Sequence, residues 1–422
     1  MVNQEYFKNK NVTVIGLARS GFACAQLLYN LGALVSVSDK KRDSQTLGFS
    51  AQLPDSIKQE LGRHTRGFIR GRDLIVVSPG VDADSKPLIW AKECGVPVIS
   101  EIECAGILCP AQIIAITGTN GKTTTTILAG RVLEAAGKKV FVLGNIGTPF
   151  SSQVHQMQAG DFVSLEVSSF QLETIRSFKP KIAAILNLTP DHLDRYRDLS
   201  EYLSAKARIF MNQDESDYLL LNREDPVLRT LASKAKSRVV YFDSSIEANL
   251  NFSAVKTIAN ILGIEKHLCD EVLQSFQGLP HRLEKVAQLK NREFVNDSKA
   301  TNPEATAFAL KNIAGPVILI AGGKDKGFDF SNFTDLITSR VRSLIVLGQA
   351  KDKIREVFNK KIPVSEAPDL KSAVESAFSQ SQEGDCILLS PMCASFDMFE
   401  NYEHRGEVFR QAVRELSAKC DR

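Results

Sequence analysis

The sequence lacks long hydrophobic runs, a signal segment and a strong net charge, and each absence excludes a class of protein. No apolar stretch approaches the roughly 18 residues that cross a bilayer, and the first eleven residues carry no hydrophobic core of a secretory signal. A formal net charge of +3 over 422 residues is too small for a surface that tracks nucleic acid. We therefore expect a cytoplasmic protein, without membrane insertion and without a nucleic-acid partner.

The sequence also lacks the cysteine spacing of a disulfide framework or a zinc site. Its eight cysteines contain no Cys-x-x-Cys pair and stand in apolar or mixed contexts, which is typical of reduced, buried thiols. What is present is an ordinary globular composition, with 43% hydrophobic and 24% charged residues. The length exceeds what one hydrophobic core organises, so two or three domains are expected.

Strand and helix patterns alternate along the whole chain in three cycles. Near-continuous apolar runs are typical of parallel strands covered on both faces. They occur at residues 12–16, 34–39, 73–80 and 96–100, then at 113–117, 139–144, 161–167, 181–188, 217–222 and 238–242, and finally at 316–323, 343–348 and 386–391. The pattern predicts an α/β protein with domains at 1–101, 102–278 and 279–422; the first and third are Rossmann-like, and the central one has a mainly parallel sheet.

The first domain carries an altered dinucleotide fingerprint. The turn Gly16-Leu17-Ala18-Arg19-Ser20-Gly21 follows a strand and opens a helix, and Asp39 ends the next strand, where a ribose-binding acid would lie. Ala18 replaces the middle glycine that lets backbone approach a pyrophosphate, which weakens the hypothesis of an NAD-dependent oxidoreductase. The helix N-terminus can still hold a phosphate, and Ser78 and Gly80 can form a second wall. A tight turn without a ligand is the alternative.

The central domain opens with the segment ITGTNGKTTTT, residues 116–126, between a predicted strand and a predicted helix. Its end matches a phosphate-binding loop, but the first glycine, Gly118, comes two residues late. Glycines let backbone N–H groups point at phosphate, Lys122 can reach the terminal phosphates, and the Thr123 hydroxyl can ligate Mg²⁺. The predicted nucleotide-binding residues are Gly118, Thr119, Asn120, Gly121, Lys122, Thr123 and Thr124; a plain turn is the alternative.

Three further residues of the central domain are candidates for metal chemistry. Glu166 lies at the end of a strand, where an acid can complete an Mg²⁺ shell, and His192 stands between two aspartates after another strand. Lys206 lies in a predicted helix that begins at a Ser200 cap. A surface carboxylate, a structural histidine and a solvated lysine are the alternatives for the three residues.

The order of several motifs resembles the Mur ligase family of ATP-dependent amide ligases, which build the peptide of bacterial cell-wall precursors. The matching motifs between residues 118 and 327 are, in order, GTNGKTT, LEVSSFQLE, NLTPDHLDRY with AKARIF, GLPHRLE, NDSKATN and GGKDKG. A further motif, LSPMCASFDMFENYEHRG, extends the match to residue 406. GLARSG, the segment GNIG at residues 144–147 and the C-terminal motif are similar to the D-glutamate-adding branch. The Asp-Asn-Pro-Arg box of the branches that add diaminopimelate or lysine is absent.

The resemblance implies a reaction and its cofactors. ATP would phosphorylate the carboxylate of UDP-N-acetylmuramoyl-L-alanine, and the amine of D-glutamate would attack the acyl phosphate, releasing ADP and phosphate in peptidoglycan precursor synthesis. Lys122, Glu166, His192 and Lys206 are implied as catalytic. Two Mg²⁺ sites are implied, with Thr123, Glu166, His192 and Lys206 as ligands; Lys206 would carry a carbamate formed from CO₂.

The resemblance also implies binding residues outside this set. ATP would contact Asn251, Arg282 and Asp297, although Glu247–Asn251 departs from the usual His-Asn-x-x-Asn of the family. Both substrates would meet at Lys299 and Thr301. The UDP-sugar would contact Leu17, Ala18, Arg19, Asp39, Ser78, Gly80 and Asn145, and D-glutamate would contact Lys326, Ser395, Phe396 and Tyr402, where phenylalanine is commoner than tyrosine.

Three alternatives to this assignment stay open at this point. Another Mur-type ligase with a different amino acid, or a folylpolyglutamate synthase, would share the central loop, but the latter lacks the first domain. An NAD-dependent oxidoreductase would depend on residues 16–39 alone. A non-catalytic nucleotide-dependent switch is the third. We expect a monomer.

Overall fold

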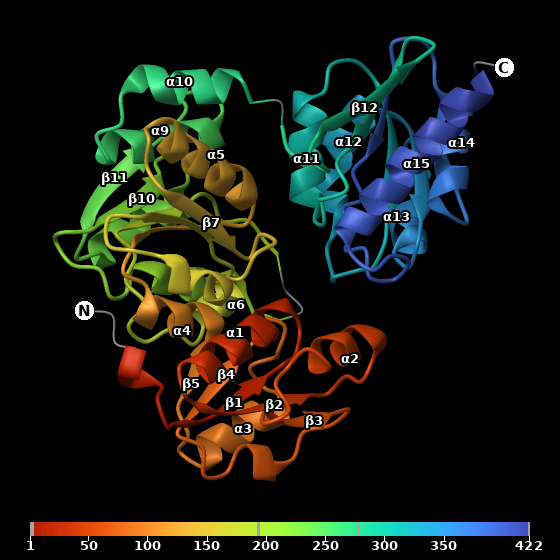
Figure 1. Cartoon of the computed structure of the whole chain (residues 1–422). Coiled ribbons are helices and arrows are strands. Elements are labelled where there is room, and N and C mark those ends of the chain that lie inside the picture. Colours follow the sequence, from red (N-terminus) through yellow and green to blue (C-terminus); the bar gives the residue numbers. More distant parts are fainter. Residues whose placement is uncertain (1–3, 192–194, 277, 421–422) are drawn as a thin grey trace. The chain divides into compact units, whose positions relative to one another are not determined.

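The computed structural model describes residues 4–191, 195–276 and 278–420 and contains three β-sheets (Figure 1). Two compact units are present: Met1–Leu188 with Asp198–Phe276, and Thr189–Arg197 with Gln277–Arg422. The first unit holds two sheets and the second holds one. The α/β class and the three successive sheets confirm the predicted fold class. The domain limits at residues 101 and 278 stay a prediction.

The N-terminal sheet is wholly parallel, with strand order β3-β2-β1-β4-β5. The buried strand β1 lies at its centre, so its C-terminal end opens between two neighbouring strands, which is where ligands bind in such sheets. The elements are η1 (Gln4–Tyr6), β1 (Asn11–Ile15), α1 (Arg19–Asn30), β2 (Leu34–Asp39), α2 (Ser44–Ser50), β3 (Lys58–Leu61), η2 (Arg66–Phe68), β4 (Leu74–Val77), α3 (Lys86–Glu93), β5 (Val98–Ser100) and α4 (Glu101–Leu108).

The central sheet is also wholly parallel, with order β11-β10-β9-β6-β8-β7. Apolar side chains of α5 and α9 cover one of its faces, and α10 packs against both helices. The strands are β6 (Gln112–Thr117), β7 (Val140–Gly144), β8 (Phe162–Glu166), β9 (Ile182–Ile185), β10 (Tyr218–Asn222) and β11 (Arg238–Phe242). The helices are α5 (Lys122–Ala135), η3 (Phe150–Ser152), η4 (Val154–Gln156), α6 (Ser169–Leu172), α7 (Leu199–Ala207), η5 (Arg208–Phe210), α8 (Pro226–Arg229), η6 (Thr230–Lys234), α9 (Leu250–Ile261) and α10 (Lys266–Gln274).

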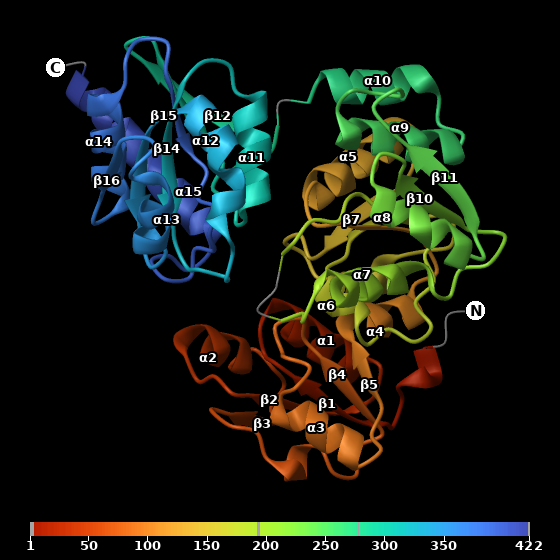
Figure 2. The same cartoon turned by 180° about the vertical axis from the view of Figure 1, so that it is seen from behind.

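The C-terminal sheet has order β12-β13-β17-β14-β15-β16, and only β12 runs antiparallel to its neighbour. Helices α11, α12 and α13 pack their apolar side chains on one face, and α14 and α15 pack theirs on the other. Figure 2 shows these helices around the sheet. The elements are β12 (Glu284–Leu289), β13 (Arg292–Asn296), α11 (Pro303–Asn312), β14 (Val317–Gly322), η7 (Phe330–Phe333), α12 (Thr334–Arg340), β15 (Val341–Leu347), α13 (Lys351–Phe358), β16 (Val364–Glu366), α14 (Leu370–Gln380), β17 (Cys386–Leu389) and α15 (Tyr402–Cys420).

Helix α4 joins the two sheets of the first unit through two buried carboxylates. Glu103 accepts hydrogen bonds from the backbone N–H groups of Arg176, Ser177 and Phe178, at 2.7–3.0 Å, and from the Ser177 hydroxyl. Glu101 accepts one from the Ser151 N–H at 2.6 Å. Because both carboxylates are about 1% exposed, they tie the end of the N-terminal sheet to loops of the central sheet.

The structure corrects one helix start and adds strands that the sequence did not predict. Helix α7 begins at Leu199 and its N-cap is Asp198, whose carboxylate accepts from the Glu201 N–H; the predicted Ser200 cap is wrong. Strands β3, β12, β13 and β16 were not predicted. No helix in the described residues is long and apolar enough to cross a membrane.

Candidate functional site

The predicted phosphate loop connects β6 to α5 and adopts a conformation that requires two glycines. Gly118 has φ of 152° and Gly121 has φ of 82° at the N-cap of α5. A Cβ on Gly121 would lie 2.2 Å from Oδ1 of Asn251, which comes from the start of α9. Asn251 therefore lies against the loop, as expected of a nucleotide-binding residue, although its contact with adenine stays a prediction.

A residue that sequence reasoning missed, Asn187, holds the loop from the end of β9. Its Oδ1 accepts from the N–H groups of Thr119 and Asn120 at 3.1 and 2.8 Å, and its Nδ2 donates to the Asn120 carbonyl at 3.0 Å. The Asn187 side chain thus fixes the turn through hydrogen bonds to backbone groups of Thr119 and Asn120. The only sequence signal is its place directly after an apolar strand.

Two lysines converge on one loop carbonyl. Lys122 Nζ donates to the carbonyl oxygens of Gly118 and Thr119 at 3.0 and 2.8 Å, and Lys206 Nζ donates to that of Gly118 at 2.8 Å. Lys206 is 1% exposed, and its ammonium lies 4.3 Å from the centre of the Tyr202 ring. The alternative of a solvated lysine at this position is wrong, because α7 buries Lys206 beside the loop.

Glu166 lies next to the loop because β8 pairs with β6. Its register partner is Ile116, two residues before Gly118. The carboxylate is 2% exposed, and Oε1 accepts from Asn145 Nδ2 at 3.0 Å. The alternative of a surface carboxylate is therefore wrong.

The structure brings most of the candidate catalytic and metal residues together around one loop, namely Lys122, Thr123, Glu166 and Lys206. His192 falls outside the described residues. Among the described residues no cluster of three His, Cys, Asp or Glu side chains could hold a metal ion.

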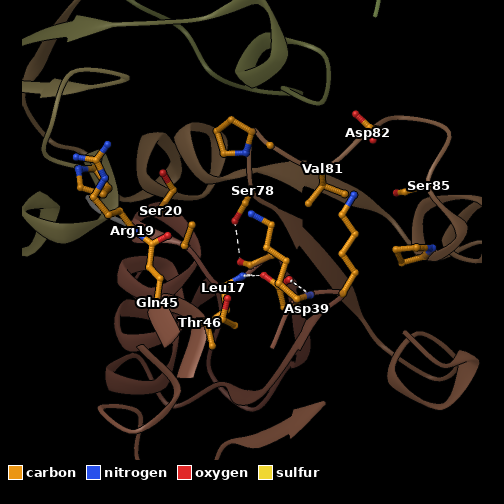
Figure 3. A pocket seen from close by; sticks show the side chains of 18 of the residues that line it. Leu17, Arg19, Ser20, Asp39, Gln45, Thr46, Ser78, Val81, Asp82 and Ser85 are labelled. Atoms are coloured by element: carbon orange, nitrogen blue, oxygen red, sulfur yellow. Dashed lines mark hydrogen bonds between the residues drawn. The ribbon is translucent and has the colours of Figure 1, made fainter. Parts of the chain in front are cut away.

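A pocket of about 690 Å³ lies at the C-terminal edge of the N-terminal sheet and reaches the central sheet (Figure 3). It is lined by every predicted UDP-sugar residue, namely Leu17, Ala18, Arg19, Asp39, Ser78, Gly80 and Asn145. No side chain caps the N-terminus of α1, so its first N–H groups can meet an anion. Since Asn145 also bonds Glu166, this residue connects the pocket to the surroundings of the phosphate loop.

Asp39 has a structural role in this pocket that the sequence did not reveal. Its Oδ2 accepts from the Leu17 N–H at 2.5 Å, and its Oδ1 accepts from the Lys41 N–H at 2.7 Å (Figure 3). Ser78 Oγ donates to the Gly16 carbonyl at 2.8 Å. The side chains of Asp39 and Ser78 therefore fix the turn before α1, and a direct contact of either with ligand stays a prediction.

The remaining predicted residues lie in the second unit. Burial raises the pKa of Asp297 to about 7, although it accepts from Ser390 Oγ at 2.8 Å and from the Leu283 N–H at 3.2 Å, and Arg282 is a nearby cation. Lys299 Nζ lies 3.6 Å from the centre of the Tyr402 ring. The Thr301 N–H donates to the Lys299 carbonyl.

Other predicted residues of this unit differ in their exposure. Lys326 pairs with Asp191 at 3.4 Å. Ser395 is 2% exposed and Phe396 is 69% exposed.

Arg405 is a second residue that sequence reasoning missed. It is buried, and its guanidinium donates to Ser298 Oγ, to the Ser298 carbonyl and to the Cys393 carbonyl at 2.7–3.1 Å. These bonds hold the segment before Lys299 and the segment before Ser395 together. The sequence offered only its position within the C-terminal motif as a signal.

Comparison with known proteins gives matches along most of the chain. Family profiles match in three places: Mur ligase MurD-like, N-terminal domain, at residues 10–100; Mur ligase middle domain at 116–270; and Mur ligase, glutamate ligase domain, at 281–393. A UDP-N-acetylmuramoylalanine–D-glutamate ligase of Caldanaerobacter subterraneus subsp. tengcongensis is 40% identical, covering 97% of this chain and 99% of the relative. That of Geotalea uraniireducens is 42% identical, covering 97% and 98%.

Solved structures show the same fold at low identity. A UDP-N-acetylmuramate–alanine ligase of Thermotoga maritima is 18% identical with a TM-score of 0.62, covering 97% of this chain and 100% of that chain. A pseudomurein peptide ligase of Methanothermus fervidus is 19% identical with a TM-score of 0.61, with the same coverage. With its loop, its pocket and its relatives in agreement, this chain belongs to the Mur ligase family, and within it to the UDP-N-acetylmuramoylalanine–D-glutamate ligases.

Proposed function

We propose that this protein uses ATP to join D-glutamate to UDP-N-acetylmuramoyl-L-alanine through an acyl phosphate. The observation that carries the proposal is Asn145, which lines the nucleotide-sugar pocket and donates to Glu166 beside the phosphate loop. A UDP-sugar in the pocket can therefore extend its terminal carboxylate toward the residues that hold ATP. Such positioning of two reactants supplies much of the rate of a bimolecular reaction.

The phosphate loop provides the electrostatic part of the first step. Lys122 lies at the N-terminus of α5, where the helix dipole adds to its charge. We assign it to the charge that develops as the γ-phosphate moves to the carboxylate oxygen. Because phosphoryl transfer depends on positioning and charge stabilisation more than on covalent chemistry, the fixed loop is the main catalytic device.

The family uses ATP, and the residues around the loop also fit Mg²⁺. Thr123 offers a hydroxyl and Glu166 a carboxylate, whereas the ammonium of Lys206 cannot ligate a cation. A carbamate formed from CO₂ would give Lys206 the carboxylate oxygens that ligation requires. Bound Mg²⁺ would neutralise phosphate charge. The proposed ligands of two Mg²⁺ ions are Thr123, Glu166, His192 and carbamylated Lys206.

The second unit is proposed to complete ATP binding and to hold D-glutamate. Arg282 is assigned to the γ-phosphate and Asp297 to the ribose. The residues assigned to D-glutamate are Lys326, Ser395, Phe396 and Tyr402. Those assigned to the place where the two substrates meet are Lys299 and Thr301. The ammonium of Lys299 makes a cation–π contact with the Tyr402 ring, which would hold its charge beside the proposed D-glutamate site.

Phosphate release by the purified protein tests the proposal. With ATP, Mg²⁺ and UDP-N-acetylmuramoyl-L-alanine, release is expected with D-glutamate and not with L-alanine, L-lysine or diaminopimelate. Activity with one of the latter and not with D-glutamate would contradict the substrate assignment. Gel filtration tests the expected monomer.

The role of Lys206 has a separate test. Lys206→Ala is expected to lose turnover that excess bicarbonate cannot restore, while ATP binding persists. Unchanged nucleotide hydrolysis in this variant would favour the nucleotide-dependent switch instead.

A further inference from the structure

His64 lies on the pocket wall in a hydrogen-bond network that the proposed reaction does not use. Its Nδ1 lies 2.8 Å from Ser38 Oγ, at the end of β2. Ser38 Oγ also lies 3.1 Å from Glu60 Oε2 and 3.5 Å from the Arg63 carbonyl oxygen. Glu60 in turn accepts from the Thr65 N–H at 2.8 Å, so the loop after β3 is fixed against β2.

The network determines which imidazole nitrogen carries the proton. Ser38 has one hydroxyl hydrogen, and both the carboxylate of Glu60 and the Arg63 carbonyl can only accept it. Since Ser38 donates to one of these oxygens, its Oγ must accept a hydrogen bond from His64 Nδ1–H. The single N–H proton of the neutral ring then lies on Nδ1, and Nε2 can accept a hydrogen bond from a ligand.

Burial of the His64 side chain favours this neutral form. Burial lowers the pKa of His64 and is the largest effect, while Asp39 and Glu60 oppose it and Lys40 adds to it. The pocket wall also contains Lys41 and Arg63. At neutral pH the ring therefore presents a hydrogen-bond acceptor.

The fold indicates which part of a nucleotide lies near His64. In a sheet of this order the diphosphate lies at the N-terminus of the first helix, and the nucleoside lies toward the end of the second strand. The sugar end must run the other way, because Asn145 and Gly147 on that side lead to Glu166. The base then lies beyond Asp39, where His64 lines the pocket.

We propose that His64 is a specificity-determining residue that reads the pyrimidine base, with Nε2 accepting a hydrogen bond from N3–H of uracil. The inference rests on the proposed binding of a UDP-sugar in this pocket. Uracil carries a hydrogen on N3, whereas N3 of cytosine is an acceptor and would face the lone pair of Nε2. In the complex with a cytidine nucleotide two acceptors, Nε2 of His64 and N3 of cytosine, would face each other without a hydrogen bond. The site therefore selects uridine over cytidine nucleotides.

Calorimetric binding of UDP and CDP to the full-length protein tests this proposal. We expect wild-type protein to prefer UDP by roughly tenfold or more. His64→Asn keeps a donor to Ser38 and lacks an acceptor at the Nε2 position, so the preference should fall to about threefold or less, mainly by weaker UDP binding. His64→Gln places an acceptor near Nε2 and should retain more of the preference. His267→Asn, which removes an exposed histidine of α10, should behave as wild type.

The outcomes separate this inference from the proposed function. An unchanged UDP preference in His64→Asn would overturn the reading of the base by His64 and leave the function intact. Equal loss in the Asn and Gln variants would also overturn it, because His64 would then only hold the loop. Failure of wild-type protein to bind UDP would instead contradict the nucleotide-sugar pocket itself.

Discussion

At the scale of single residues, Gly121 combines a backbone and a steric requirement. With φ of 82°, a side chain would be strained by about 1–2 kcal/mol, and its Cβ would also lie 2.2 Å from Asn251 Oδ1. We expect Gly121→Ala to lower the free energy of unfolding by about 1–2 kcal/mol and to weaken ATP binding by roughly tenfold or more. Urea denaturation and calorimetry with ATP measure the two effects.

Gly137 provides the matched control for this prediction. It has φ of 69°, and nothing lies within 4 Å of a Cβ built on it. Gly137→Ala should therefore reproduce the loss of stability and leave ATP binding unchanged. Equal ATP affinity in both variants would show that Asn251 can move aside without disturbing the loop.

Asp297 predicts a pH dependence of ATP binding near neutrality. Burial raises its pKa to about 7, so the carboxyl is protonated in the folded protein below that pH and ionised above it. A ribose hydroxyl donates better to a carboxylate than to a carboxylic acid. The KM for ATP should therefore fall as the pH rises from about 6 to about 8.

Asp297→Asn identifies the group responsible for this change. The amide does not titrate, so the fall in KM across this pH range should disappear, whereas the KM for D-glutamate should keep its wild-type profile. An unaltered ATP profile in the variant would assign the titration to another residue.

Individual residues of the site were predictable to different degrees. Lys122 and Glu166 follow from motif spacing, because a loop and a strand end fix where a side chain lies. Asn187 and Arg405 did not follow, because their partners are brought to them only by tertiary packing. The tautomer of His64 needed the positions of Ser38 and Glu60, which come from two neighbouring strands.

At the scale of elements, α4 provides the strongest test of how the first unit is held together. Glu103→Ala would leave the N–H groups of Arg176, Ser177 and Phe178 without this acceptor, and the bond to Phe178 is buried. A buried donor without a partner costs about 1–3 kcal/mol and the two partly buried bonds add to this, so we expect a loss of about 2–3 kcal/mol in urea denaturation.

An exposed glutamate provides the comparison for Glu103. Glu93 pairs with Arg66 at the surface, and Glu93→Ala should cost about 1 kcal/mol or less. If Glu103→Ala were no more destabilising than Glu93→Ala, α4 would not be the connection we describe.

The strands that the sequence predicted share one property, and three of the four strands that it missed share another. Buried parallel strands such as β6, β8 and β14 are continuous apolar runs and are recognisable without tertiary information. β3, β12 and β16 lie at sheet edges and carry polar, partly exposed residues, so their pattern resembles that of a loop. The start of α7 was misplaced because Asp198 and Ser200 are both good N-caps, and only the structure shows which one accepts the bond.

At the scale of the whole molecule, the pocket residues and the D-glutamate residues belong to different units. Every residue that lines the pocket lies between Gly16 and Gln171, within the first unit, whereas Lys326, Ser395, Phe396 and Tyr402 lie in the second. The two substrates are therefore assigned to surfaces with separate hydrophobic cores. Binding of one substrate alone should stabilise only the unit that carries its residues.

Hydrogen exchange with mass spectrometry tests this separation. UDP alone should slow amide exchange in peptides that contain residues 16–20, 39–46, 63–64 and 78–87, because the ligand would order the loops that Asp39 and Ser78 hold. Peptides from residues 278–420 should exchange as in the free protein. Inorganic phosphate at the same concentration controls for a general anion effect. Protection of the second unit by UDP alone would mean that the nucleotide contacts residues that the pocket does not contain, and the assignment of the substrates to separate units would then be wrong.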